Sequence, residues 1–192
     1  MTTANKITIL RILLVPFFIV QLIYYEDSGD ELNRVLAAFS FAIAAISDGV
    51  DGYIARRYNQ RSELGAVLDP LADKLLLVSG IVLLSFKNEH IERLPLWLAA
   101  TVLSRDVIIL LGLFVIYYVN GKVELRPRWL GKLATVLQMT AVLWLLLKWD
   151  AAWLRAWVLS AAICTGFSGI LYIGDGVRQL NASPSSAPAP KQ

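Results

Sequence analysis

The sequence has a single cysteine, Cys164, and a single histidine, His90. One cysteine cannot form a disulfide within the chain, and one histidine excludes a histidine-rich metal site. Any bound metal ion must therefore be held by oxygen ligands. Charged residues are also few, at 17% of the chain, and the net charge of +3 gives no case for nucleic acid as a partner.

Apolar residues, in contrast, make up 57% of the chain, and its mean hydropathy is +0.58. A soluble domain of this size cannot usually bury so much apolar surface, which indicates an integral membrane protein. Six apolar runs come near the roughly 20 residues that a helix needs to cross a bilayer. They cover residues 7–25, 34–56, 64–86, 94–119, 130–149 and 151–177. Because a backbone in lipid must satisfy its own hydrogen bonds, we predict an all-α, polytopic bundle of six transmembrane helices.

Basic residues cluster in alternate connections of this predicted bundle. They crowd the connections after the second and fourth helices, whereas the first connection, EDSGDELN, is acidic. Since Lys and Arg in short loops favour the cytoplasmic side, both termini are expected in the cytoplasm. Such a basic face would also attract anionic lipid headgroups. The basic residues on that side are Lys6, Arg56, Arg57, Arg61, Lys122, Arg126, Arg128, Arg178 and Lys191.

The domain organisation is simple. Residues 1–180 form one membrane domain without a detectable internal repeat. Residues 181–192, NASPSSAPAPKQ, have the Pro, Ser and Ala content typical of a disordered tail. We therefore expect the chemistry to lie in the membrane domain.

Four aspartates stand where apolar membrane segments are expected. At about 100° per residue, the acidic and small residues of the second and third helices fall on one stripe of each helix. Two helices joined by a short basic connection are expected to be antiparallel neighbours, so the four carboxylates would converge near the cytoplasmic end. The small residues leave room for close helix approach or for a substrate. The two stripes are Asp48, Asp51, Gly52 and Ala55, and then Gly65, Asp69 and Asp73.

Converging carboxylates require a cation. Without one they would repel one another and become protonated in apolar surroundings. Oxygen ligands without Cys or His suit Mg²⁺ or Mn²⁺, and Mg²⁺ tends to bind through carboxylates together with substrate phosphates. The aspartates therefore indicate a diphosphate or another phosphate ester as substrate. Arg56, on the same helix as Asp48 and Asp51, could bind a phosphate oxygen through its planar guanidinium.

The spacing of these residues resembles the signature of the CDP-alcohol phosphatidyltransferases. The sequence D-G-V-D-G-Y-I-A-R is followed after eight residues by G-A-V-L-D-P-L-A-D. An accidental match at eight fixed positions is improbable, and the predicted six helices agree with the family. The matching positions are Asp48, Asp51, Gly52, Ala55, Arg56, Gly65, Asp69 and Asp73.

The resemblance implies that a phosphatidyl group moves from CDP-diacylglycerol to an alcohol, releasing CMP. It implies that Asp48, Asp51 and Asp69 hold the metal ions that neutralise the diphosphate. Asp73 would lie near the metal and act as general base on the acceptor hydroxyl. The protein would then be an integral protein of a bacterial inner membrane, with its active site toward the cytoplasm.

Substrate-binding roles follow from the same resemblance. The small residues of the motif would leave room for the cytidine, and the polar sequence NKITILR near the N-terminus resembles a motif of phosphatidylglycerophosphate synthases. Arg105 and Lys132 would bind the phosphate of the acceptor; alternatively, Arg105 only neutralises Asp106. The residues assigned to CDP-diacylglycerol are Asn5, Thr8, Asp48, Gly52, Ala55, Arg56 and Gly65, and those assigned to the acceptor are Arg11, Arg105 and Lys132.

Two acceptors stay open. The sequence is most similar to the branch of the family that comprises phosphatidylglycerophosphate and cardiolipin synthases, whose acceptors are glycerol 3-phosphate and phosphatidylglycerol. The stretches NQRSELGAVLDPLADK and SRDV resemble cardiolipin synthases, and Ala134 replaces the second Lys of the GKxKT pattern common in glycerol phosphate enzymes. Losing that cation should weaken a site for doubly charged glycerol 3-phosphate. Phosphatidylglycerophosphate synthesis is, however, the commoner task for a small bacterial member.

Intramembrane aspartates also occur in other roles and in other classes of membrane protein. An isolated intramembrane aspartate could pair structurally with a basic residue or cap a helix. A membrane prenyltransferase also holds a metal diphosphate on aspartates, but its two motifs lie far apart in sequence, whereas Asp48 and Asp73 lie within 26 residues. A cation transporter would not explain Arg56 beside the acids. The family's members often pair, so a homodimer is a candidate assembly, although the sequence carries no dimer signature.

Overall fold

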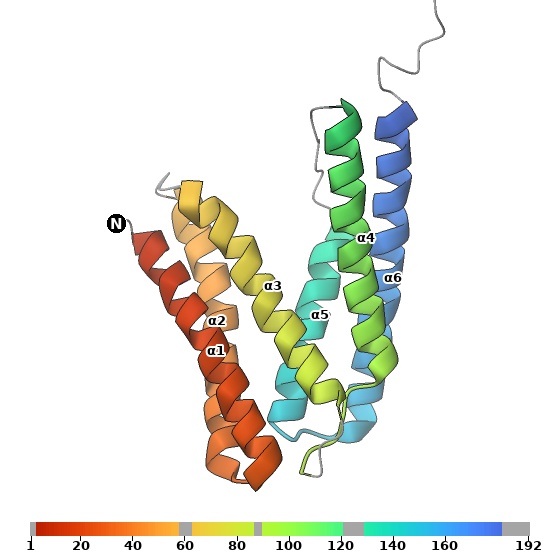
Figure 1. The fold of residues 1–192 in the computed structure, drawn as a ribbon. Helices are drawn as coiled ribbons and strands as arrows, with labels where there is room; N and C mark the ends of the chain where they lie inside the picture. The colour runs from red at the N-terminus through yellow and green to blue at the C-terminus, as the bar shows by residue number, and fades with distance from the viewer. Residues whose placement is uncertain (1–2, 58–62, 87–89, 121–128, 182–192) are drawn as a thin grey trace, which may run out of the picture.

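The computed structural model describes residues 3–57, 63–86, 90–120 and 129–181; within these, the side chains of 3–7, 48–57, 63–70, 120 and 180–181 are not described. The described ranges contain helices and no strand, which confirms the all-α prediction (Figure 1). The helices are α1 (Thr3–Ser28), α2 (Glu31–Arg57), α3 (Glu63–Ser85), α4 (Leu96–Asn120), α5 (Trp129–Leu146) and α6 (Ala151–Asn181).

Consecutive helices run antiparallel. The upper end of the bundle in Figure 1 holds the starts of α1, α3 and α5 and the ends of α2, α4 and α6. The other helix ends lie at the opposite, lower end. The start of α1 and the end of α6 thus lie at the same end as the aspartate motif.

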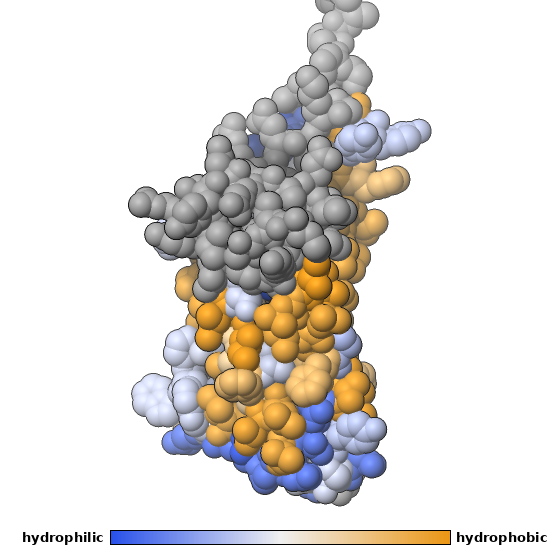
Figure 2. All heavy atoms as spheres, turned by 90° about the vertical axis from the view of Figure 1, so that its left-hand side faces the viewer, coloured by the Kyte–Doolittle hydropathy of each residue, from blue (hydrophilic) through white to orange (hydrophobic). Residues whose placement is uncertain are grey.

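Four of the helices are long and apolar enough to cross a membrane. Their spans are Thr8–Ser28, Leu96–Val119, Trp129–Leu146 and Ala151–Gln179. The described side chains of α2 and α3 cover only part of each helix, so six crossings and cytoplasmic termini stay predictions. Figure 2 shows apolar side chains over the middle of one face and hydrophilic residues at its lower end, the pattern expected of a surface that faces lipid.

The core is built from small and large apolar side chains that interlock between helices. Phe18 of α1 and Phe41 of α2 place their ring centroids 5.3 Å apart. A Cβ added to Gly80 of α3 would lie 3.2 Å from Val142 of α5 and 3.3 Å from Phe41. Because lipid provides no hydrophobic drive between helices, this close packing must supply the association.

Polar contacts tie the helix ends together at the lower end. Lys148 forms an ion pair with Glu31 at the start of α2, and Arg34 Nε donates to Glu31 Oε2 at 2.6 Å. The hydrogen bond from Lys148 holds the pKa of Glu31 below its ordinary value, and the same bond raises the pKa of Lys148. Arg34 also donates to the carbonyl of Leu146, the last residue of α5. These contacts link α2 to the α5–α6 turn.

Several helix boundaries differ from the sequence prediction by three or four residues. Helix α1 spans Thr3–Ser28 rather than 7–25, and α2 begins at Glu31 rather than at residue 34. Helix α5 ends at Leu146 rather than at residue 149, because Lys148 adopts a left-handed conformation with φ of 52°. Helix α6 continues four residues beyond the predicted end, to Asn181. None of these changes moves a predicted site residue out of its helix.

Gly29 makes the turn between α1 and α2. Its φ is +69°, and its N–H donates to the carbonyl of Tyr25 at 2.8 Å, so it closes α1 in a left-handed conformation. An added Cβ would lie 2.7 Å from Cε1 of His90. The Tyr25 hydroxyl in turn donates to the His90 carbonyl at 3.1 Å, which joins this turn to the segment before α4.

We expect Gly29→Ala to lower the free energy of unfolding by about 1–2 kcal/mol, the cost of a left-handed conformation for a residue with a Cβ. His90 must also move away. Thermal unfolding in detergent measures the change. The matched control is Gly112→Ala in α4, where an added Cβ meets no atom within 4 Å. Equal melting temperatures for the two variants would contradict this role of Gly29.

Candidate active site

The aspartate motif lies on α2 and α3 at the upper end of the bundle. Asp48, Asp51, Gly52, Ala55 and Arg56 belong to the last turns of α2, and Gly65, Asp69 and Asp73 to the first turns of α3. The two helices are antiparallel and in contact, as predicted. Of these residues only Asp73 has a described side chain, and it is half-buried. The convergence of the four carboxylates therefore stays a prediction.

Helix α1 contributes two buried polar residues near the same end. Thr8 is 2% exposed and Arg11 is completely buried. The side chain of Asn5, one turn earlier, lies outside the described residues. Both Thr8 and Arg11 interact with other groups of the protein. Because a guanidinium is costly to bury in apolar surroundings, Arg11 indicates a polar interior where α1 packs against α2 and α3.

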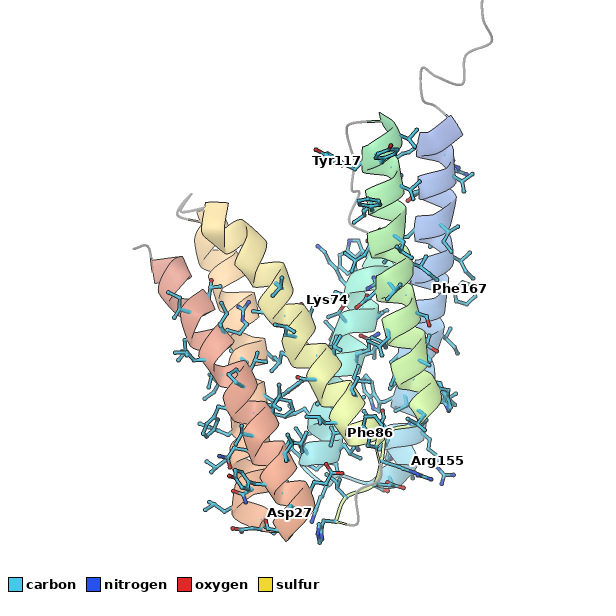
Figure 3. The ribbon with its side chains drawn as sticks, viewed as in Figure 1. Asp27, Lys74, Phe86, Tyr117, Arg155 and Phe167 are labelled. Atoms are coloured by element: carbon cyan, nitrogen blue, oxygen red, sulfur yellow. The ribbon has the colours of Figure 1, made fainter. Side chains whose placement is uncertain are left out.

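Asp106 of α4 holds two cations. Its Oδ1 accepts a hydrogen bond from Arg105 Nη1 at 2.8 Å, and its Oδ2 pairs with Lys74 of α3. Lys74 follows Asp73 in the chain and lies on the side of α3 that faces α4 (Figure 3). One carboxylate is thus shared by two cations, which leaves this cluster with a surplus of one positive charge.

Residues of α5 and α6 surround the Arg105 guanidinium. Arg105 Nη2 donates to Ser168 Oγ at 3.4 Å, and the guanidinium carbon lies 5.7 Å from the ring centroid of Tyr172. A Cβ on Gly131 would be 3.1 Å from Arg105 Nη2, so the absence of a side chain there makes room for the guanidinium. Three helices therefore fix the position of one arginine.

Lys132 follows Gly131 but does not join this cluster. Its side chain is exposed, and in the described part of the chain it forms no ion pair with Asp106, the carboxylate that binds Arg105. Ala134 is 1% exposed and lies three residues beyond Gly131, on the same face of α5. The structure thus brings the start of α5 against Arg105 without bringing the two predicted cations into contact.

Several residues of the cluster were missed by the sequence reasoning. Lys74, Ser168 and Tyr172 were not predicted, and neither was the hydrogen bond of 2.6 Å from Gln138 Nε2 of α5 to Thr165 Oγ1 of α6. A signal was present for α6, because Thr165, Ser168 and Tyr172 are spaced as i, i+3 and i+7. Polar residues at that spacing in an apolar helix mark an inward face.

A possible metal centre rests on the predicted aspartates alone. Among the residues whose side chains are described, no three acidic, histidine or cysteine side chains come together. Asp48, Asp51 and Asp69 lie outside that part. Three carboxylates without a histidine or cysteine partner are the kind of donor that a hard divalent cation prefers, and these positions lie on two antiparallel neighbouring helices.

A helical bundle with four apolar helices long enough to cross a membrane, and with charged residues paired between its helices, defines an integral membrane protein. The model of the CDP-alcohol phosphatidyltransferase family matches residues 1–168, and the chain belongs to this family. It is a membrane enzyme that uses CDP-diacylglycerol to transfer a phosphatidyl group.

Curated relatives agree along nearly the whole chain. The proteins named CDP-diacylglycerol–glycerol-3-phosphate 3-phosphatidyltransferase from Salmonella typhimurium (strain LT2) and Escherichia coli (strain K12) are each 34% identical over 179 residues. The match covers 92% of this chain and 92% of each relative. These findings confirm the resemblance, and they give no support to the prenyltransferase or transporter alternatives.

The cluster around Arg105 can be tested through Gly131. We expect Gly131→Ala to displace the guanidinium by a few tenths of an ångström and to raise the KM for the acceptor alcohol by about threefold to tenfold, with a smaller change in the KM for CDP-diacylglycerol. Steady-state CMP release measures both constants.

The matched control is Gly166→Ala in α6, where the added Cβ meets no atom within 4 Å. If both variants kept the acceptor KM of the parent enzyme, Arg105 would have no role in acceptor binding that depends on its position.

Proposed function

We propose that the enzyme transfers the phosphatidyl group from CDP-diacylglycerol to glycerol 3-phosphate, giving phosphatidylglycerophosphate and CMP. The names of the relatives, 34% identical over nearly the full length, support this acceptor. The surplus positive charge around Asp106 is the structural observation that favours it, because glycerol 3-phosphate carries a phosphate that must be neutralised inside the membrane domain. Arg105 would bind that phosphate.

Lys74 can supply the positive charge that is missing because Ala134 replaces a lysine. The missing second lysine of α5 should weaken a glycerol 3-phosphate site, and that loss favoured phosphatidylglycerol as acceptor. Lys74 brings another cation to the Arg105 cluster from α3. A lysine at position 134 would also have to be buried, since Ala134 is 1% exposed beside the arginine. The substitution therefore does not count against glycerol 3-phosphate.

The aspartates would provide the metal-dependent chemistry. Members of this family generally depend on a divalent metal ion, and Asp48, Asp51 and Asp69 would hold Mg²⁺ or Mn²⁺ here. A bound metal ion would supply charge neutralisation at the diphosphate of the donor. Asp73 would take the proton of the acceptor hydroxyl as its oxygen attacks the phosphorus of the phosphatidyl group and the bond from that phosphorus to CMP breaks.

The other motif residues would bind substrates. Gly52, Ala55 and Gly65 would leave room for the cytidine of CDP-diacylglycerol, and Arg56 would bind a phosphate oxygen. Asn5 and Thr8 would lie near the nucleotide, and Lys132 and Arg11 would assist Arg105 at the acceptor. The buried positions of Thr8 and Arg11 support a polar interior at this level, and the exposed side chain of Lys132 would have to turn inward to join it.

The orientation in the membrane follows from the same charges. We infer that the upper end faces the cytoplasm of a bacterial inner membrane, because most of the basic residues of the sequence belong to the helix ends and connections on that side. Glycerol 3-phosphate, a charged and water-soluble molecule, would then reach the site directly from the cytoplasm.

We expect purified enzyme with CDP-diacylglycerol and Mg²⁺ to release CMP when glycerol 3-phosphate is added and to stay near background with phosphatidylglycerol. Mass spectrometry of the lipid product provides the second readout. Excess EDTA should abolish turnover, and Mg²⁺ or Mn²⁺ should restore it. Turnover with phosphatidylglycerol alone would identify a cardiolipin synthase and overturn the proposed acceptor, while full activity in EDTA would overturn the metal assignment.

Asp73→Asn tests whether Asp73 acts as the general base or as a metal ligand. We expect this variant to lose at least about 100-fold in kcat, a typical contribution of a positioned general base, and to keep metal-dependent binding of CDP-diacylglycerol. Asp69→Asn is the comparison, since it should weaken donor binding itself. Equilibrium binding of the donor, measured beside the CMP release rate, distinguishes the two. An equal loss of donor binding in both variants would show that Asp73 acts as a metal ligand instead.

A further inference from the structure

A groove lies at the lower end of the bundle, opposite the end that carries the aspartate motif. Its volume is about 460 Å³, and it is bounded by the segment that leads into α4 and by the first turns of α6. Glu92, Arg93 and Arg155 supply its polar side. Leu154 and Val158 supply an apolar floor and are 5% and 2% exposed. None of these residues belongs to the predicted active site.

The groove changes from polar to apolar along α6. Arg155 is the fifth residue of this helix, and Val158 and Leu159 follow three and four residues later. At a rise of about 1.5 Å per residue, they lie roughly 5–6 Å further along the helix axis, toward the middle of the bundle. Leu159 is 53% exposed and borders the groove on its outer side. A ligand that fits this gradient has a charged head and an apolar body.

The level of the groove corresponds to a membrane–water interface. Trp97 of α4 lines it, and Trp149 and Trp153 stand close to the start of α6; the three are 46%, 55% and 66% exposed. Exposed tryptophans at helix ends mark the depth of the lipid headgroups. Arg155 lies at this lower end of the helices and points away from the bundle (Figure 3). The groove therefore lies at the depth of the lipid headgroups.

The charged side chains at the groove are not paired with other described residues of the protein. In the described ranges, Glu92, Arg93 and Arg155 form no ion pair or side-chain hydrogen bond with another residue. Two arginines against one glutamate leave a net charge of +1. Guanidinium groups bind phosphate oxygens through planar, charge-assisted hydrogen bonds. The groove thus has the charge and the polarity gradient that complement an anionic phospholipid.

We propose that this groove binds one anionic phospholipid from the leaflet opposite the active site. Arg93 and Arg155 bind the phosphate of the headgroup, while the glycerol backbone and the upper acyl carbons lie on Leu154, Val158 and Leu159. The net positive charge selects an anionic lipid over a zwitterionic one. The bound lipid bridges the start of α4 and the start of α6, so its occupancy stabilises the folded enzyme.

The test compares dioleoyl phosphatidylserine with dioleoyl phosphatidylcholine. Phosphatidylserine is anionic and is neither substrate nor product of the proposed reaction. Native mass spectrometry of the purified enzyme gives the fraction with one bound lipid, and thermal unfolding gives the stabilisation. In the parent enzyme we expect phosphatidylserine to bind more tightly. In Arg93→Gln/Arg155→Gln we expect its affinity to fall about tenfold, to the level of phosphatidylcholine.

Arg178→Gln is the control for removing a positive charge outside the groove. This residue lies in the last turn of α6, far from the groove and exposed, so its removal should leave the lipid preference unchanged. Leu159→Trp fills the apolar part of the groove without altering charge, and it should weaken both lipids alike. CMP release should stay at the parent level in Arg93→Gln/Arg155→Gln and in Leu159→Trp, because the groove and the aspartate motif lie at opposite ends. The test of lipid binding is therefore independent of whether glycerol 3-phosphate is the acceptor.

Four outcomes would overturn the proposal, three of them with the lipids and variants and one with inorganic phosphate. The first is an unchanged preference for phosphatidylserine in the double variant, and the second is an equal loss in Arg178→Gln. The third is a change in oligomeric mass for Leu159→Trp without loss of bound lipid, which would make the groove a contact between protein chains. Inorganic phosphate is tested alone, and stabilisation equal to that given by the lipid would also exclude a lipid site.

Discussion

An ionised side chain inside a membrane bundle must be neutralised by the protein, and Asp106 is where the described structure meets this requirement. Its two oxygens bind Arg105 from the same helix and Lys74 from α3. Arg105 and Asp106 are largely buried, and taking these two charges out of water costs several kcal/mol for each ion, which their attraction offsets only if the geometry is kept. Without Asp106, two cations would face each other at this level. The packing of α3 against α4 therefore depends on this carboxylate.

The position of Arg105 in turn explains the small and polar residues of α5 and α6. The absent side chain of Gly131 leaves space beside the guanidinium, and Ser168 and Tyr172 provide a hydroxyl and an aromatic face. The aromatic face attracts the cation and costs no hydrogen-bonding group. One turn deeper, the bond between Gln138 and Thr165 satisfies two more buried polar groups. The polar stripe of α6 thus follows from the requirement to hold one buried cation.

Sequence periodicity predicted the helices well because, in lipid, length and apolarity are nearly sufficient to define a helix. The boundary of α5 was three residues off because Lys148 adopts a left-handed conformation, stabilised by its ion pair with Glu31 of another helix. The aspartate motif was readable since its residues follow the helical period within one hairpin. Lys74 and Ser168 were not, because each becomes significant only through a partner that is far away in the chain, 32 and 63 residues distant.

The two ends of the bundle differ in how their helices are joined. At the lower end, the N–H of Leu94 donates to the carbonyl of Leu84 at 2.8 Å, so the end of α3 is bonded to the segment before α4. Above this junction α3 and α4 diverge toward the upper end (Figure 1), and in the described ranges the ion pair between Lys74 and Asp106 is what links them there. Lys74 is nearly half exposed, whereas Arg105 is largely buried. An anionic acceptor that entered from the upper end would therefore meet the more exposed cation, Lys74, before the largely buried Arg105. Because Asp106 binds both cations but neutralises one positive charge, the second positive charge of the cluster remains for the phosphate that Arg105 is proposed to bind.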